Sequence, residues 1–283
     1  MPRESGAYAV EMAPETRQRL FRGGLALGML VAGHFVLASV LHLFLFHPRR
    51  DEASEVARVA ERVRYVADDG VRLAAWFVPA RGARRRTLVF FHGNAETASD
   101  AWSWADVLAD RGTDVLLAEY RGYGESEGTP SARGIERDAE AAVRFLLDER
   151  SVAPNSLVVQ GHSLGGAAAI AALAGPASGA AGAVIESTFT SLHDMARVIV
   201  GLPLTRLVPD AYALDSAARA PSIRVPILHV HGDRDEVIPF ELGQRLGALF
   251  PTERFLRVEG GTHNLGDPSV TREILAFVER VAP

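Results

Sequence analysis

The chain has 283 residues, carries a net charge of −5 at neutral pH and contains no cysteine. This length allows one large domain with an additional segment, and a hydrophobic fraction of 48% is enough for a packed core. The charge gives no sign of nucleic-acid binding, and the lack of cysteine excludes disulfides, a thiolate nucleophile and cysteine-ligated metals.

The first predicted element is a membrane-spanning helix at residues 23–46, after an N-terminal tail at 1–22. The segment carries no charge, and a helix of this length reaches about 36 Å, more than the roughly 30 Å of a hydrocarbon core. A cleaved signal peptide and a buried core helix are the alternatives, but the exit Leu45-Phe46-His47-Pro48-Arg49 offers no small-residue cleavage site. We therefore expect a single-pass membrane protein, and arginines on both sides of the span leave its orientation open.

A linker at 47–61 leads into residues 62–283, where strand and helix patterns alternate. The run from Val63 to Val78 has Asp68-Asp69-Gly70 at its middle, which predicts a hairpin. The strands expected after it are 87–91, 114–119, 156–159, 183–185, 227–230 and 255–258, and the expected helices are 101–108, 135–147, 164–174, 240–250 and 269–281. This alternation predicts an α/β fold, with a mostly parallel central sheet that helices cover on both faces.

One long segment at 189–223 breaks this alternation between two expected strands. It contains Pro203, Pro209 and Pro221, and it is too long for an ordinary connection. We expect it to form a short helical lid over a site.

The segment Gly161-His162-Ser163-Leu164-Gly165 lies between an expected strand and an expected helix. A G-x-S-x-G segment in this place forms a sharp turn that exposes a nucleophilic serine, and the glycines allow the strand and the helix to approach closely. The alternative is that the Ser163 hydroxyl merely caps the helix, since serine is a favoured N-cap. Capping requires neither glycine, so we expect Ser163 to be a nucleophile.

The segment His92-Gly93-Asn94-Ala95 follows the expected strand 87–91. Because ligands bind at the carboxyl ends of parallel strands, this turn is expected to direct the backbone N–H of Asn94 toward Ser163. The N–H of Leu164, where the next helix begins, is the second expected donor. The two groups would form an oxyanion hole, and a plain glycine turn is the alternative.

The base and the acid of a triad are expected after the last two strands. His263 is the expected general base, and a carboxylate is expected to orient it. Asp233 and Asp235 both qualify by type, and their spacing does not decide between them. Glu186, at the end of an earlier strand, is a further alternative. The order Ser, Asp, His is the one expected of a single sheet topology.

No cofactor and no metal site are expected. His229 and His231 lie two residues apart on one face of a strand, a spacing that can suit a metal, but the sequence offers no third ligand.

These motifs resemble those of the α/β-hydrolase superfamily over about residues 62–283, and most of all those of its membrane-anchored, Bem-like members. The resemblance rests on His92-Gly93-Asn94-Ala95, on residues 119–128, on residues 161–166 and on Gly261-Thr262-His263-Asn264. In the family, the acid is the second Asp of a G-x-x-D-x-x-[VI]-P turn. Gly232-x-x-Asp235-x-x-Ile238-Pro239 matches this turn, so the resemblance selects Asp235 rather than Asp233.

The resemblance implies an α/β-hydrolase fold and a serine hydrolase that cleaves carboxylic esters or thioesters through an acyl-enzyme. The expected catalytic residues are Ser163, Asp235 and His263, with Asn94 and Leu164 at the oxyanion hole. A membrane anchor and a lid favour lipophilic acyl substrates, lipids among them. A serine peptidase or amidase and a non-catalytic binding or receptor protein on the same fold are the alternatives.

Overall fold

The structure, a computed structural model, describes residues 46–50, 59–200 and 213–282, together with single helical positions between residues 21 and 33. The chain divides into two units, Met1–Leu45 and Phe46–Pro283. Most of the predicted anchor at 23–46 therefore lies outside the described residues, as do the middle of the linker and the middle of the predicted lid. In the part of the chain that is described, no helix is long and apolar enough to cross a membrane.

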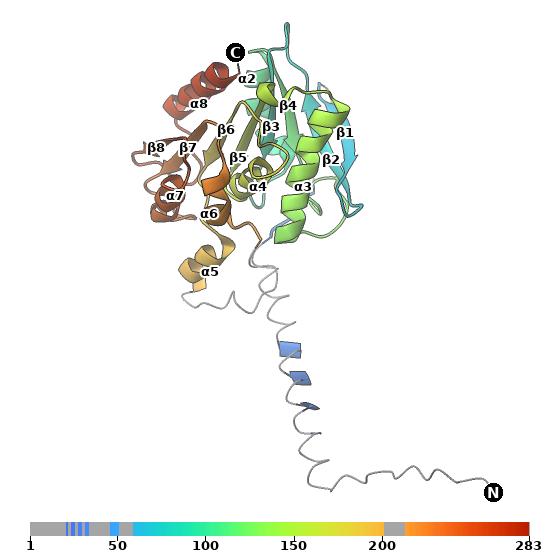
Figure 1. The fold of residues 1–283 in the computed structure, drawn as a ribbon, viewed down its shortest axis with the longest axis vertical. Helices are drawn as coiled ribbons and strands as arrows, with labels where there is room; N and C mark the ends of the chain where they lie inside the picture. Colours follow the sequence, from blue (N-terminus) through green and yellow to red (C-terminus); the bar gives the residue numbers. More distant parts are fainter. Residues whose placement is uncertain are drawn as a thin grey trace, which may run out of the picture. The chain divides into compact units, whose positions relative to one another are not determined.

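The second unit is built on one eight-stranded sheet with the strand order β1-β2-β4-β3-β5-β6-β7-β8 (Figure 1). The strands are β1 (Glu61–Val66), β2 (Arg72–Val78), β3 (Arg86–Phe91), β4 (Thr113–Ala118), β5 (Leu157–His162), β6 (Gly182–Glu186), β7 (Ile227–Gly232) and β8 (Glu253–Val258). β1 and β2 form the expected hairpin, β2 pairs antiparallel with β4, and all other pairs are parallel. The mostly parallel sheet predicted from the sequence is therefore confirmed.

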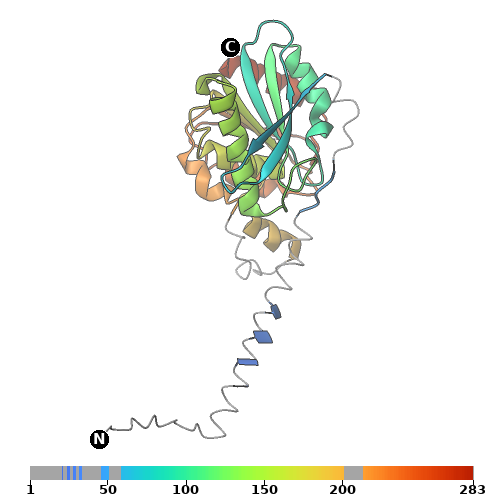
Figure 2. The same cartoon turned by 90° about the vertical axis from the view of Figure 1, so that its right-hand side faces the viewer.

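Helices cover both faces of this sheet, and Figure 2 shows α2 and α3 on opposite sides of it. The α-helices in the described residues of the unit are α2 (Trp102–Ala109), α3 (Ala132–Arg144), α4 (Leu164–Leu173), α5 (Leu192–Val200), α6 (Ser216–Arg219), α7 (Phe240–Gly247) and α8 (Pro268–Val281). The Ser131 side chain begins α3 by accepting a hydrogen bond from the Gly134 N–H, and the Asp267 side chain begins α8 in the same way from Ser269. Helices α5 and α6 are the described helices of the predicted lid.

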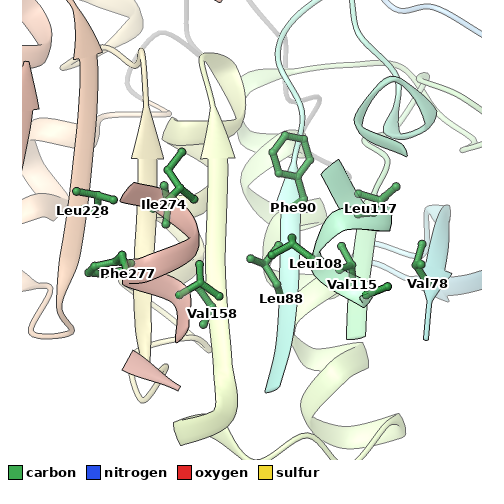
Figure 3. Packing of buried hydrophobic residues seen from close by; sticks show 14 of the residues in the cluster. Val78, Leu88, Phe90, Leu108, Val115, Leu117, Val158, Leu228, Ile274 and Phe277 are labelled. Carbon is green, nitrogen blue, oxygen red and sulfur yellow. The ribbon is translucent and has the colours of Figure 1, made fainter. Parts of the chain in front are cut away.

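The core between the sheet and helices α2 and α8 explains why the strand sequences are apolar runs. Leu108 of α2 lies beside Leu88 of β3 in this core (Figure 3). Phe277 of α8 packs in the same cluster as Leu228 of β7 and Val158 of β5. Each such side chain stabilises the fold by about 1.5–3 kcal/mol when fully buried. The core thereby fixes the sheet, and with it the relative positions of the strand ends.

A buried arginine joins three separate segments on the other side of the sheet. Arg121, which is 7% exposed, donates from its guanidinium to both Asp138 of α3 and Asp69 of the hairpin turn, each at 2.8 Å. Its backbone N–H also donates to Asp138 at 2.7 Å. Asp138 therefore satisfies both a buried charge and a buried backbone group.

Replacing Asp138 by alanine is expected to lower the free energy of unfolding by about 3–5 kcal/mol, because it leaves the buried Arg121 cation short of an acceptor. Asp68→Ala is the matched control, since its ion pair with Arg137 is about half exposed at a distance of 3.5 Å. Urea unfolding followed by circular dichroism measures both variants, and the control should change stability by less than about 0.5 kcal/mol. Equal losses in the two variants would contradict this account.

Candidate active site

Ser163 lies at the turn between β5 and α4 with a φ of 55° and a ψ of −118°. A non-glycine residue adopts this backbone conformation only where the surrounding structure holds it, and such strain gathers at functional sites. Here the Ser163 N–H donates to the carbonyl of Glu186 at 2.8 Å, and the hydroxyl of Thr188 donates to the Ser163 carbonyl at 2.7 Å. The Ser163 side chain makes no capping hydrogen bond to α4, so the capping alternative is wrong.

We call the sharp turn at residues 161–165 the elbow. Its glycines Gly161 and Gly165 lie where backbone segments come into contact. A Cβ on Gly161 would lie 2.1 Å from the carbonyl oxygen of Gly165, and one on Gly165 would lie 1.9 Å from that of Phe91. Both distances are far below van der Waals contact, and the atoms met are backbone atoms that cannot rotate away. The close approach of β5, α4 and β3 therefore requires glycine at both positions, as the sequence pattern predicts.

Replacing Gly165 by alanine is expected to lower the free energy of unfolding by about 3 kcal/mol or more, since the added methyl group overlaps the end of β3. Gly175→Ala is the matched control, because its Cβ would meet its nearest atoms at 3.7 Å. Chemical denaturation of the two variants measures the difference. A Gly165→Ala protein as stable as the control would show that the elbow packs less tightly than described.

The imidazole of His263 lies between Ser163 and Asp235. Its Nε2 is 3.1 Å from Ser163 Oγ, and its Nδ1 is 3.0 and 2.9 Å from the two carboxylate oxygens of Asp235. An ionised carboxylate only accepts hydrogen bonds, so His263 carries its proton on Nδ1 and leaves Nε2 to accept the Ser163 hydroxyl proton. The structure thus brings together three residues that are far apart in the sequence.

The Asp235 carboxylate is held in place by several donors besides His263. The backbone N–H groups of Val237 and Ile238 donate to its Oδ1 at 2.9 and 2.8 Å, and His231 Nε2 lies 3.3 Å from its Oδ2. Burial raises the pKa of Asp235, but the hydrogen bonds from His231, His263 and Ile238 outweigh it and hold that pKa well below its usual range. Asp235 therefore stays ionised while it orients His263.

The two alternative carboxylates, Asp233 and Glu186, make other contacts. Asp233 pairs with Arg257 at 2.8 Å and accepts the Gly260 N–H at 2.7 Å. Glu186 accepts a hydrogen bond from Gln160 at 2.8 Å. The structure places Asp235 against His263, as the family turn pattern implies, while Asp233 holds the loop that leads to His263.

One of the two expected oxyanion donors lies within the turn at Ser163, and the other lies in the loop after β3. Leu164 is the first residue of α4, where a backbone N–H has no acceptor within its own helix. Asn94 lies in the loop after β3, and its side-chain oxygen accepts from the Tyr123 hydroxyl at 2.7 Å and from the His47 N–H at 2.9 Å. Ala95, next to it, has a φ of 60°. The loop is thus strained, like the elbow, and hydrogen bonds with Tyr123 and His47 hold its asparagine side chain.

Sequence reasoning missed four residues that hold the site in place. His231 contacts Asp235, as described above. His162 and Ser187 both meet the carbonyl oxygen of His263, at 3.2 and 3.0 Å. Glu96 accepts the Gly93 N–H at 2.7 Å. Of these four, only Glu96 could have been predicted from the sequence. It lies three residues after Gly93, a spacing at which its carboxylate can accept the Gly93 backbone N–H.

A cavity of about 640 Å³ lies beside these residues, between α2 and α8. Its polar wall includes Glu96, Gln160, His162 and Glu186, and its apolar wall includes Trp104 and Ile274. Burial raises the pKa of Glu186. Glu96 and His162 therefore border this cavity as well as the loops around Ser163.

Comparison with known proteins agrees with this architecture. The family described as "Serine aminopeptidase, S33" matches residues 82–213. The uncharacterized protein YfhR of Salmonella typhi is 30% identical over 253 residues, which cover 84% of this chain and 86% of that protein. The alpha/beta hydrolase domain-containing protein WAV2 of Arabidopsis thaliana is 30% identical over 249 residues, which cover 80% of each chain.

Among solved structures, an esterase of Pyrococcus furiosus superposes with a TM-score of 0.65 at 20% identity, covering 84% of this chain and 98% of that one. A mostly parallel sheet with a serine at the sharp turn after its central strand is the architecture of an α/β hydrolase. With relatives that match over more than two thirds of its length, the chain belongs to the α/β-hydrolase superfamily.

Proposed function

We propose that this α/β hydrolase is a serine hydrolase that cleaves carboxylic ester or thioester bonds. Ser163 is the nucleophile, His263 the general base and acid, and Asp235 the residue that orients His263. The N–H groups of Asn94 and Leu164 receive the oxyanion. One observation carries the proposal: hydrogen-bond distances of 3.1 Å from Ser163 to His263 and of 2.9 Å from His263 to Asp235.

In the proposed reaction, Ser163 Oγ attacks the carbonyl carbon of the substrate while its proton passes to His263 Nε2. The tetrahedral intermediate collapses, the bond to the leaving oxygen or sulfur breaks, and His263 returns the proton to the leaving group. Water then attacks the acyl-enzyme with His263 again as the base, which frees the acid and restores the Ser163 hydroxyl. No cofactor takes part in these steps.

The proposed substrates are lipophilic acyl compounds, lipids among them. The name esterase, which is that of the Pyrococcus furiosus structure, agrees with ester cleavage. We also propose that residues 23–46 anchor the protein in a membrane as a single span. Carbonate extraction tests the anchor: the full chain should stay with the membrane fraction, and a chain without residues 23–46 should be released.

Amide cleavage is the second candidate function, since the matching family is described as a serine aminopeptidase. The same triad can open an amide, and the substrate decides which reaction occurs. Rates on matched p-nitrophenyl esters and p-nitroanilides separate the two, and we expect the esters to be hydrolysed faster by far.

Covalent labelling with a fluorophosphonate tests the proposal directly. Ser163 Oγ should form a bond to phosphorus with loss of fluoride, while His263 takes up the hydroxyl proton. We expect one label per chain in the wild-type protein and none in Ser163→Ala. A folded wild-type protein that takes no label would point to a binding protein on this fold instead, and equal labelling of both proteins would show that a residue other than Ser163 reacts.

A further inference from the structure

A second histidine lies against the triad without a part in the proposed reaction. His162 directly precedes Ser163, and its ring centre is 5.0 Å from that of His263. Its Nε2 is 3.2 Å from the carbonyl oxygen of His263, and its Nδ1 is 3.5 Å from Oε1 of Glu96. Both ring nitrogens of His162 therefore face an acceptor, one in each of two loops.

Glu96 extends this contact into the loop after β3. Its Oε2 accepts the backbone N–H of Gly93 at 2.7 Å, directly beside Asn94. A continuous chain of polar contacts thus runs from Gly93 through Glu96 and His162 to the backbone of His263. It joins the loop that carries one expected oxyanion donor to the loop that carries the expected base.

The two acceptors determine the protonation state that this chain requires. A carboxylate and a carbonyl oxygen only accept, so both contacts are made at once only if His162 carries a proton on each nitrogen. The titratable groups that face His162 are Glu96, Glu186 and His263, and His92 lies behind Glu96. Two of these are carboxyl groups, and they favour the cation.

The pKa values agree with this geometry. Burial lowers the pKa of His162, but the facing carboxylate of Glu96 outweighs it, and the pKa rises above its ordinary value of 6.5. Burial acts in the opposite direction on Glu96, where His162 and the Gly93 N–H prevail and lower its pKa to about 2. His162 and Glu96 thus favour each other's charged forms.

We propose that His162, as an imidazolium, and Glu96 form a positioning pair that holds the loop of Asn94 and the loop of His263 at the spacing that acyl transfer needs. This inference rests on the proposed serine-hydrolase function and assigns two residues to it that neither contact the substrate nor transfer a proton. Ser187 supports the same carbonyl of His263 from the end of β6, at 3.0 Å. His162 differs from it in being titratable.

The pair predicts that the reaction rate falls at alkaline pH, which we call the alkaline limb of the pH profile. When His162 loses one proton, it keeps a hydrogen only for Glu96 or only for His263, and a lone pair then faces the other acceptor. Either way one of the two loops loses its contact with His162, and a small displacement of reacting groups costs up to about 100-fold in rate. The rate should therefore fall above the pKa of His162.

The variant Glu96→Gln removes the charge of residue 96 but keeps its size and hydrogen-bonding capacity. It therefore shows whether the charge of the pair is needed to position the two loops. The glutamine oxygen can still accept the Gly93 N–H, and its amide can donate to Nδ1 of a neutral His162. The neutral ring then keeps its Nε2–H for His263 at any alkaline pH. We expect this variant to label within about threefold of the wild type at neutral pH and to lose the alkaline limb. Glu96→Ala, which has no such replacement, should be slower by about 10- to 100-fold.

The experiment is the rate constant of fluorophosphonate labelling between about pH 6 and pH 10. It compares the wild type with Glu96→Gln, Glu96→Ala and His162→Gln, which has no titratable ring and should show no alkaline limb. Glu273→Gln is the matched control, because it changes the same side chain in an exposed pair with Arg254 and should keep the wild-type profile. NMR of ¹⁵N-labelled histidine measures the protonation state of His162 without any reaction. His162 should show two protonated nitrogens at pH 7 in the wild type and one in Glu96→Gln.

The outcomes separate this inference from the proposed function. Labelling that is lost in Ser163→Ala, with an alkaline limb that Glu96→Gln removes, supports both. Labelling at Ser163 with the same limb in Glu96→Gln or His162→Gln overturns the pair and leaves the hydrolase standing. A neutral His162 in the wild-type NMR spectrum overturns the pair as well. No labelling of the wild type overturns the hydrolase, and the pair's role in acyl transfer fails with it.

Discussion

Ser163→Ala is expected to lower kcat for ester hydrolysis by about 10⁶-fold, the loss seen when the nucleophile of a serine triad is removed. Alanine has no oxygen to attack a carbonyl, and His263 then has no proton to take up from it. The fold should persist, because the Ser163 side chain makes no capping bond and the Ser163 backbone is held by the Glu186 carbonyl and the Thr188 hydroxyl.

Initial rates on short p-nitrophenyl esters measure this loss, with circular dichroism as the check on folding. Ser156→Ala is the matched control, since its hydroxyl only donates to the carbonyl of Ala153 at 2.9 Å. Its kcat should equal that of the wild type. Turnover by a folded Ser163→Ala protein at more than about a thousandth of the wild-type rate would mean that another group attacks the substrate.

Asp235→Asn is expected to lower kcat by about 10⁴-fold at neutral pH. The asparagine amide would donate to His263 Nδ1 and so drive the imidazole proton onto Nε2, which then cannot accept the Ser163 proton. The geometry should change little, because the side chain keeps its size and an oxygen for the Val237 and Ile238 N–H groups. A KM close to that of the wild type would show that the change acts on the chemical step.

Asp233→Asn is the control that decides between the two carboxylates of this loop. Asp233 faces Arg257 and the Gly260 N–H rather than the imidazole, so its variant should keep kcat within about tenfold. Comparable losses in the two variants would show that the loop as a whole, and not the contact between Asp235 and His263, sets the rate.

The sequence predicted which segments become strands and helices, because that information is local. The apolar run at 87–91 and the turn of Asp68-Asp69-Gly70 each determine their own element, and the structure has both. The position of β4 between β2 and β3 was not predicted. Strand order depends on which apolar faces meet across the whole sheet, and no short segment encodes it.

The candidate site divides in the same way. Ser163 was found because its elbow needs glycines at fixed spacing, and Asp235 because a family turn pattern marks it. No sequence pattern marks His162 and Ser187. Their contacts with the His263 carbonyl exist only once the carboxyl ends of β5, β6 and β8 lie at the same end of the sheet. The residues of the proposed triad could be read from motifs, whereas the residues that support them could not.

The strand order also has a consequence for how the molecule is made. From β5 onward, β6, β7 and β8 are added to the sheet one after another at the same growing edge. During synthesis, a chain that has emerged only through β6 has neither Asp235 nor His263. With the proposed roles, its serine is inert until the final strand docks. With these roles, a fluorophosphonate label would report that the strands up to β8 and the loop of His263 are in place.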